Sequence, residues 1–148
     1  MRRLFAALAF TLAASFAFAA DAGAPRSAET AADDPRATPA YAALVLRKAA
    51  VEAELSGLSS QLTDESPRVV AKRFELAAVG REMEAMRRVG REGVRMLSRA
   101  YGELVVGKVA LEVELQSLRA DYTPDHPDVR KKEAQLAALA RELEEMLR

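Results

Sequence analysis

The most versatile reactive side chain in this sequence is a histidine. His126 is the single histidine of the 148 residues and lies between Asp125 and Pro127, with Asp121 and Asp128 close by. An imidazole among carboxylates can act as a pH-sensitive group or as a weak metal ligand. Tight zinc binding needs more nitrogen or sulfur ligands than this, and the sequence contains no cysteine. We therefore interpret His126 as a turn residue that orders the start of a helix, and we expect no metal site.

Carboxylate pairs are the next candidates for catalysis. Glu52 and Glu54 are two positions apart, and Glu144 and Glu145 are adjacent. On a helix such neighbours point to different faces, so they cannot converge on one reacting atom. The remaining residues form neither a nucleophile–base arrangement nor a glycine-rich phosphate loop. We expect no enzymatic activity and no cofactor.

The composition indicates helices packed on helices. The 22 basic and 22 acidic residues cancel and are interspersed, so the chain has no basic stripe for phosphates and nucleic acid is not an expected partner. Tryptophan is absent and aromatic residues make up 5% of the chain, while aliphatic residues are abundant. Aliphatic seams between helices supply burial without aromatic residues. The sequence predicts an all-α fold.

A tandem repeat organises most of the chain. When the sequence is shifted by 60 residues, residues 41–88 align with residues 101–148 without a gap, and 21 of the 48 positions are identical. A fixed period of this kind indicates a duplicated supersecondary unit, so both copies should share one local structure.

Each half of the repeat has apolar residues every three or four positions, which predicts helices that present one apolar seam. The predicted seam residues of the first arm are Tyr41, Leu44, Lys48, Val51, Leu55 and Leu58; those of the third arm are Tyr101, Leu104, Lys108, Leu111, Leu115 and Leu118; the second and fourth arms continue the seam through Leu76 and Leu136. We interpret the tyrosines as ends of the core rather than as a grip for sugars or peptides.

Two lysines, Lys48 and Lys108, occupy seam positions where an aliphatic residue is expected. A polar seam residue can fix the register and the number of partners. Alternatively, its stem lies along the seam while the ammonium reaches water or pairs with Glu52 or Glu112 one turn later. Both interpretations remain open from the sequence.

Proline-containing turns separate the arms within each repeat. Pro67 and Pro127 each suit the first turn of a helix, and Ser66 and His126 precede them, with Ser66 as a predicted helix cap. Such short turns make the two arms antiparallel. The predicted fold is two tandem antiparallel helical hairpins, coiled-coil-like, over residues 41–88 and 101–148. A lone hairpin has close to zero net stability, so the hairpins must pack on each other or on another subunit.

Residues 89–100 form the predicted connector, which contains two glycines. If this connector turns back, the product is a four-helix bundle. If it does not, the product is an elongated rod that dimerises.

The amino-terminal region reads as an export signal. Met1-Arg2-Arg3 precedes an apolar run, and Ala17 and Ala19 are the small residues that a signal peptidase recognises. We predict a signal peptide over residues 1–19, cleaved after Ala19, and a disordered linker over residues 20–40. The protein would then be periplasmic or secreted, and would contact a membrane only if the leader stayed uncleaved.

One stretch resembles a known family. It consists of Tyr122-Thr123-Pro124-Asp125-His126-Pro127-Asp128-Val129, followed by Lys131, Gln135, Leu136, Leu139 and Leu143. Residues 118–143, with a weaker echo at 58–86, resemble the periplasmic coiled-coil region of polysaccharide copolymerases, the chain-length determinant proteins. The resemblance implies a helical hairpin in the bacterial envelope that takes part in subunit contacts, and polysaccharide-export machinery as a possible partner.

These observations lead to two functional hypotheses. The first is a non-enzymatic, exported helical-hairpin protein that acts as a structural or interaction module, through self-association or binding to an envelope protein. The second is a small periplasmic chaperone or stress sensor that binds unfolded clients on a helical surface.

Overall fold

The structure, a computed structural model, describes residues 33–148. The predicted signal peptide and residues 20–32 of the predicted linker lie outside the described residues. Within 33–148 all regular structure is helical and no strand occurs, which confirms the all-α prediction. The elements are η1 (Pro35–Ala37), α2 (Pro39–Ser59), α3 (Pro67–Arg87), α4 (Arg91–Val94), α5 (Arg99–Asp121) and α6 (Pro127–Met146).

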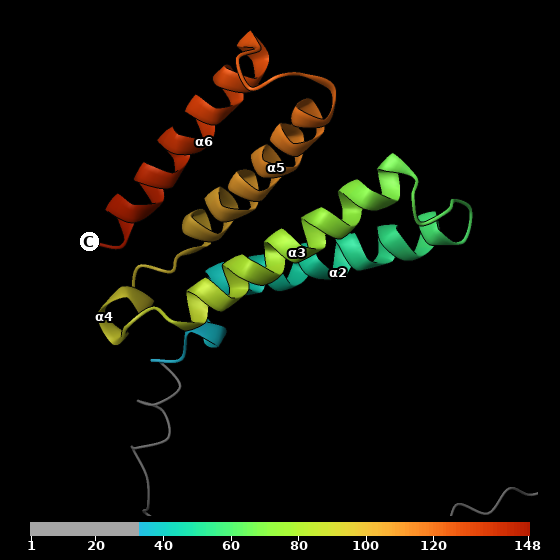
Figure 1. The fold of residues 1–148 in the computed structure, drawn as a ribbon. Coiled ribbons are helices and arrows are strands. Elements are labelled where there is room, and N and C mark those ends of the chain that lie inside the picture. The colour runs from blue at the N-terminus through green and yellow to red at the C-terminus, as the bar shows by residue number, and fades with distance from the viewer. Residues whose placement is uncertain (1–32) are drawn as a thin grey trace, which may run out of the picture.

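Two helical hairpins diverge from a common base (Figure 1). Helices α2 and α3 pair in the first hairpin, and α5 and α6 pair in the second. The connector turns the chain back, so that α5 packs on both α2 and α3, whereas α6 makes its substantial contacts with α5. The turns of the two hairpins lie at separate ends of the resulting V. The arrangement is bundle-like at the base and open towards the tips.

Equivalent hydroxyl caps begin the first helix of each hairpin. Thr38 Oγ1 accepts a hydrogen bond from the backbone N–H of Tyr41, and Ser98 Oγ accepts one from Tyr101, both at 3.2 Å. Each bond satisfies a backbone donor that the helix itself leaves without a partner. Thr38 and Ser98 are 60 residues apart, so the repeat begins three residues earlier than the alignment of identical residues indicated.

The predicted linker, residues 20–40, is wrong at its carboxyl end. Residues 35–37 form a 3-10 helix capped by Asp34, α2 begins at Pro39, and Ala40 is fully buried. The physical reason is the Thr38 cap, which extends α2 backwards into the proline-containing segment.

The predicted connector, residues 89–100, is more ordered than a plain turn. It contains the short helix α4, and the buried side chains of Val94 and Leu97 anchor it to the protein. The Leu97 carbonyl also accepts a hydrogen bond from the backbone N–H of Ala40, at 3.3 Å. The connector thereby ties the base of the second hairpin to the start of the first.

The main core lies at the base, where α2, α3 and α5 meet and the carboxyl-terminal part of α6 joins them. It combines residues from both hairpins with Leu97 of the connector: Ala40, Tyr41, Leu44, Ala78, Val79, Met83, Met86, Leu97, Tyr101, Val105, Val109 and Leu143. Because the hairpins separate beyond this cluster, their tips are held only by the seams within each hairpin.

The structure keeps every predicted seam residue at least partly covered. Tyr41, Leu44, Val51, Tyr101 and Leu115 are buried; Leu55, Leu58, Leu76, Leu104, Leu111, Leu118, Leu136 and both seam lysines, Lys48 and Lys108, are half-buried. Among residues 33–148, no helix combines the length and the hydropathy that a membrane span requires.

Candidate interaction surfaces

A mostly apolar cleft of about 660 Å³ lies between the two hairpins. Helix α3 forms one wall and α5 the other, with a contribution from α6. The lining residues are Pro67, Val70, Ala71, Phe74, Arg81, Glu112, Val113, Leu115, Gln116, Ser117, Arg119, Ala120 and Leu136. Val70 is 45% exposed although it is a large aliphatic residue. The cleft exists because the hairpins diverge above the base and leave the facing sides of α3 and α5 uncovered.

Charged side chains connect the walls of the cleft at its base. Arg81 of α3 donates a hydrogen bond to Glu112 of α5 at 3.1 Å, and its guanidinium carbon lies 5.7 Å from the centre of the Phe74 ring. Lys108 of α5 lies 2.5 Å from Glu82 of α3. Because opposite charges face each other across the two helices, these pairs favour the observed register of α5 on α3.

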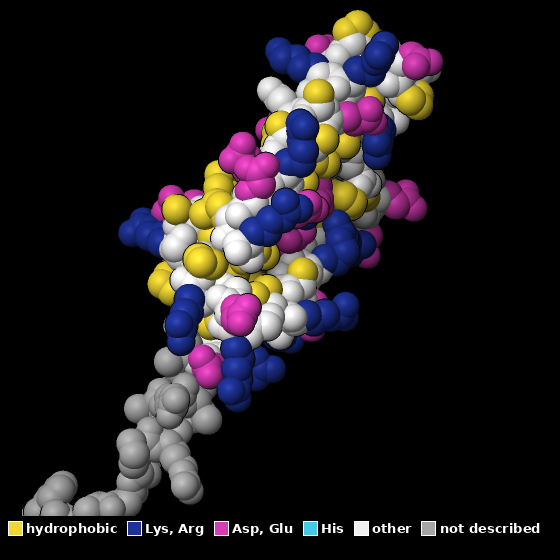
Figure 2. Space-filling model, turned by 90° about the vertical axis from the view of Figure 1, so that its left-hand side faces the viewer, with side chains coloured by type: hydrophobic (Ala, Val, Ile, Leu, Met, Phe, Trp, Pro, Cys, Tyr) yellow, Lys and Arg dark blue, Asp and Glu magenta, His cyan; other side chains and the backbone are white. Residues whose placement is uncertain are grey.

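Over the face that includes α6, lysine, arginine, aspartate and glutamate are interspersed with apolar side chains (Figure 2). No large patch of one sign stands out on that face. This pattern agrees with the balanced charge of the sequence and offers no continuous anionic or cationic track.

The two seam lysines have different environments. Lys48 lies 2.6 Å from Glu52 on its own helix, as one of the two interpretations of the sequence proposed. Lys108 instead crosses to Glu82 on α3, with Glu112 at 3.6 Å. Lys108 therefore acts in the contact between hairpins, whereas Lys48 lies at the surface with 42% of its side chain exposed.

A charged network links α2 to α3 within the first hairpin. Glu75, which is 3% exposed, forms ion pairs with Arg47 and Lys72, and Lys72 also lies 2.6 Å from Glu54. The hydrogen bond from Lys72 lowers the pKa of Glu54, and the hydrogen bonds to Glu54 and Glu75 raise the pKa of Lys72. Each charge is paired, which is what a buried carboxylate requires.

The second hairpin repeats part of this network. Lys132 lies 2.5 Å from Glu114, and this pair corresponds to Lys72 and Glu54 of the first hairpin. Gln135 replaces Glu75, and Gly107 replaces Arg47. The lysine–glutamate pair is therefore common to both hairpins, and the buried carboxylate belongs to the first alone.

The turn residues act in local structure. His126 is the N-cap of α6: its Nδ1 accepts a hydrogen bond from the backbone N–H of Asp128 at 3.3 Å, and its ring stacks on Tyr122 with 4.2 Å between centroids. Ser66 occupies the matching N-cap position of α3 but makes no side-chain capping hydrogen bond. Pro67 and Pro127 are the first residues of their helices.

His126 also has no metal-binding neighbourhood around it. Within residues 33–148, no group of three or more histidine, cysteine, aspartate or glutamate side chains could hold a metal ion. The contacts of His126 with Asp128 and Tyr122 give it a structural role at the hairpin turn.

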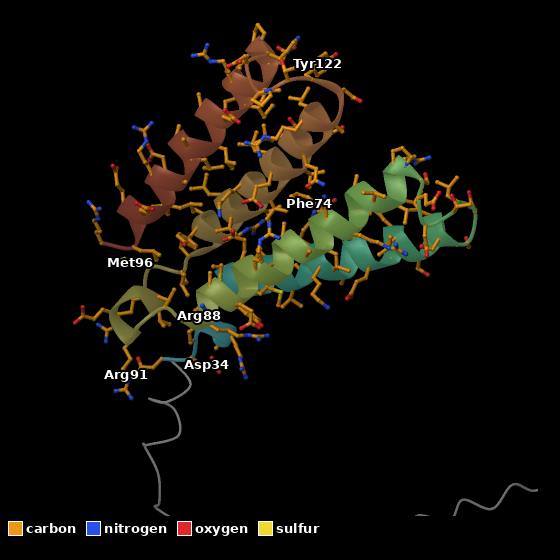
Figure 3. The ribbon with its side chains drawn as sticks, viewed as in Figure 1. Asp34, Phe74, Arg88, Arg91, Met96 and Tyr122 are labelled. Atoms are coloured by element: carbon orange, nitrogen blue, oxygen red, sulfur yellow. The ribbon has the colours of Figure 1, made fainter. Side chains whose placement is uncertain are left out.

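Phe74 is one of the cleft residues that the sequence analysis missed, together with Val70 and Val113. It belongs to α3 and lies on the side of that helix that faces α5 (Figure 3). The equivalent residue of the second repeat is Ala134, so the aromatic ring breaks the repeat. The sequence did contain a signal for Phe74: it is a large apolar residue that lies off the predicted seam and occurs in only one repeat.

A second stripe of valines was also missed. Val105 and Val109 lie one turn apart on α5 and are each 1% exposed, because they pack into the contact between the hairpins. They do not belong to the predicted seam of α5. The sequence signal for these valines was that the segment forming α5 has apolar residues on two helix faces rather than one.

Comparisons with known proteins provide no relative for this chain. No protein-family model, no curated protein and no solved structure matches it.

Proposed function

We propose that this protein is an exported, non-enzymatic interaction module of the bacterial envelope, which binds an amphipathic helix of a protein partner in the cleft between its hairpins. One observation carries the proposal. Apolar side chains on both walls of the cleft are left uncovered, while the base holds the two walls in place. Helices that lay an apolar face into a groove are a common mode of protein recognition.

The chemistry of the cleft defines the partner. Val70, Phe74 and Val113 would contact the apolar face of the incoming helix. Arg81 and Arg119 border the cleft and pair with Glu112 and Glu133 of this chain; their side chains are 58% and 55% exposed, so they can also reach carboxylates on the partner. The proposed occupant is therefore a helix with one apolar stripe and acidic residues beside it.

The envelope setting is part of the same proposal and rests on the sequence. The charged and apolar start of the chain supports export. The resemblance of residues 118–143 to the periplasmic region of polysaccharide copolymerases supports a partner in polysaccharide export. The two-hairpin fold is compatible with that setting.

Site-directed photo-crosslinking in intact cells tests the proposal. A photoreactive amino acid at position 74 should crosslink to one or a few defined envelope proteins, whereas the same group at position 122 should not. Tyr122 is the matched control because it is exposed but lies at the hairpin tip, outside the cleft. Equal crosslinking at both positions, or none at position 74, would contradict the proposal.

A double substitution provides an independent test. Val70→Arg with Phe74→Ala gives the first hairpin the residues that the second carries at Arg130 and Ala134. The fold should therefore tolerate both changes, and retained helical circular dichroism would verify that it does. We expect the crosslinked species to fall at least tenfold when this variant carries the photoreactive group at position 113.

The chaperone hypothesis is the second candidate, favoured by the open form of the same cleft. A chaperone would crosslink to many unrelated proteins from position 74, and would suppress light scattering by a heat-unfolded model enzyme. An interaction module should leave that scattering unchanged. The two candidates therefore give opposite results in one assay.

A further inference from the structure

The contact between the two hairpins uses a different face on each repeat. From the second hairpin, the contact takes one side of α5, which we call the α5 stripe: Val105, Lys108 and Glu112. From the first hairpin, it takes α2 at the base, where Ala40 meets Gly102, and one side of α3, which we call the α3 stripe: Ala78, Arg81, Glu82 and Met86. The pairs Lys108–Glu82 and Arg81–Glu112 join the two stripes.

The duplication places a second copy of each stripe on the outside of the molecule. The equivalent of the α5 stripe is an α2 stripe, formed by Val45, Lys48 and Glu52. The equivalent of the α3 stripe is an α6 stripe, formed by Ala138, Arg141, Glu142 and Met146. All seven residues are identical between the inner and outer stripes, although fewer than half of the positions in the repeat as a whole are identical.

The inner and outer stripes differ in what covers them. Val105 is 1% exposed in the α5 stripe, whereas Val45 is 44% exposed in the α2 stripe. On the other side, Ala78 is fully buried, whereas Ala138 and Glu142 are exposed. Met146 is the exception in the α6 stripe, because it packs partly against the core. The rest of the outer stripes has the side chains of a helix contact and is more exposed than its inner counterpart.

We infer that a second copy of this chain binds head to tail, with the α2 stripe of one copy on the α6 stripe of the next. Lys48 would pair with the partner's Glu142, and Glu52 with the partner's Arg141, as Lys108 and Glu112 pair with Glu82 and Arg81 within one chain. The inference goes beyond the proposed function, because the cleft between α3 and α5 is not part of either outer stripe.

Two substitutions make the contact between copies weaker than the one within the chain. Ala49 replaces Val109 and buries less apolar area. Ala42 replaces Gly102, whose missing Cβ allows α5 to approach Ala40 of α2 closely. The second copy also has to be recruited from solution, whereas the second hairpin is tethered to the first. We therefore expect reversible association that grows with concentration.

The geometry of the contact defines the assembly. Because the two stripes differ, the contact is heterologous, and each added copy leaves one free stripe at each end. Such contacts produce open chains or rings rather than a closed two-fold dimer. Each copy in the assembly would keep its cleft, so that the array would present one cleft per copy.

Charge reversal tests the inference on the protein as the cell processes it, by sedimentation over a range of concentrations. We expect the average mass of the unmodified protein to rise with concentration. Lys48→Glu and Glu142→Lys should each lower the association constant by about tenfold or more, because like charges then face each other. Glu142 is exposed and the Lys48 side chain is 42% exposed, so the fold should be retained, which circular dichroism would verify.

Mixing distinguishes this contact from other forms of self-association. An equimolar mixture of Lys48→Glu and Glu142→Lys should associate again, because the acidic side chain at position 48 of one variant then faces the basic side chain at position 142 of the other. The double variant that carries both changes should also associate. Arg68→Glu is the matched control, since Arg68 is an exposed residue of α3 outside both outer stripes and the second repeat carries Asp128 there, and the variant should behave as the unmodified protein does.

The inference is overturned by a monomeric unmodified protein at all concentrations, by single variants that associate normally, or by a mixture that stays monomeric. The double variant Val70→Arg, Phe74→Ala distinguishes the inference from the proposed function, because it should lose partner crosslinking and keep self-association.

Discussion

Gly102 is the position at which one methyl group should decide how the hairpins pack. A Cβ atom at Gly102 would lie 2.7 Å from the Cα and 2.9 Å from the carbonyl oxygen of Ala40, and 3.1 Å from the Cβ of Ala43. Two of these atoms belong to the backbone of α2, which cannot move as a side chain can. Gly102→Ala should therefore push α5 away from α2.

Gly80 provides the matched control within the same protein. It lies in the interior of α3, and a Cβ atom there would meet nothing within 4 Å. The second repeat already carries alanine at the equivalent position, Ala140. Replacing glycine by alanine inside a helix gains about 0.8–1 kcal/mol, so Gly80→Ala should stabilise the protein by that amount.

The expected difference between the two variants follows from these contacts. Gly102→Ala also gains helix propensity, but overpacking of a close contact costs about 1–3 kcal/mol. The net effect should be a loss of up to about 2 kcal/mol relative to the unmodified protein. For a domain of this size, 1 kcal/mol corresponds to roughly 4 °C in Tm. Gly80→Ala should melt a few degrees above the unmodified protein and Gly102→Ala below it.

Thermal and urea unfolding followed by circular dichroism measure both variants. If Gly102→Ala melts above the unmodified protein, as Gly80→Ala should, α5 does not approach α2 as described, and the packing of the second hairpin on the first is refuted. A loss of stability in Gly80→Ala would instead count against the exposure of that position in α3.

Two further predictions concern the charged network of the first hairpin. Glu75→Gln should lower the free energy of unfolding by about 1–3 kcal/mol, because it leaves Arg47 without its buried partner; equal stability in urea unfolding would refute the buried pair. The Glu54 carboxylate, whose pKa Lys72 lowers from 4.5, adds stability that is present above pH 4.5 and is lost as the pH falls through the folded-state pKa. Glu54→Gln should therefore reduce the pH dependence of urea unfolding below pH 4.5, whereas Glu65→Gln, at an exposed carboxylate without an ion pair in the described structure, should leave it unchanged.

The helices and their pairing could be predicted from the sequence because they depend on local patterns. A three–four spacing of Leu44, Val51 and Leu55 specifies one buried stripe, and a proline-containing turn brings the next helix back alongside it. The 60-residue duplication then requires the second hairpin to match the first. These features involve neighbours within one hairpin, so no knowledge of the tertiary contact was needed.

The cleft could not be predicted in the same way. Phe74 lies off the seam, and whether an off-seam residue is buried, exposed or part of a cleft depends on how far the hairpins diverge. That divergence is set by a close contact at the base, where Gly102 meets Ala40, and by buried residues of the connector such as Leu97. Neither contact leaves a periodic signal in the sequence.

The sequence by itself determined what each repeat is: a capped, antiparallel helical hairpin with one apolar seam, because helix periodicity and turn chemistry act over a few residues. The tertiary structure alone decided what becomes of residues that the repeats share. Val105 and Lys108 lie in the contact between hairpins, while their identical counterparts Val45 and Lys48 lie at the surface. The two hairpins use different faces in their contact with each other. Identical side chains of the two repeats therefore differ only in whether another helix covers them.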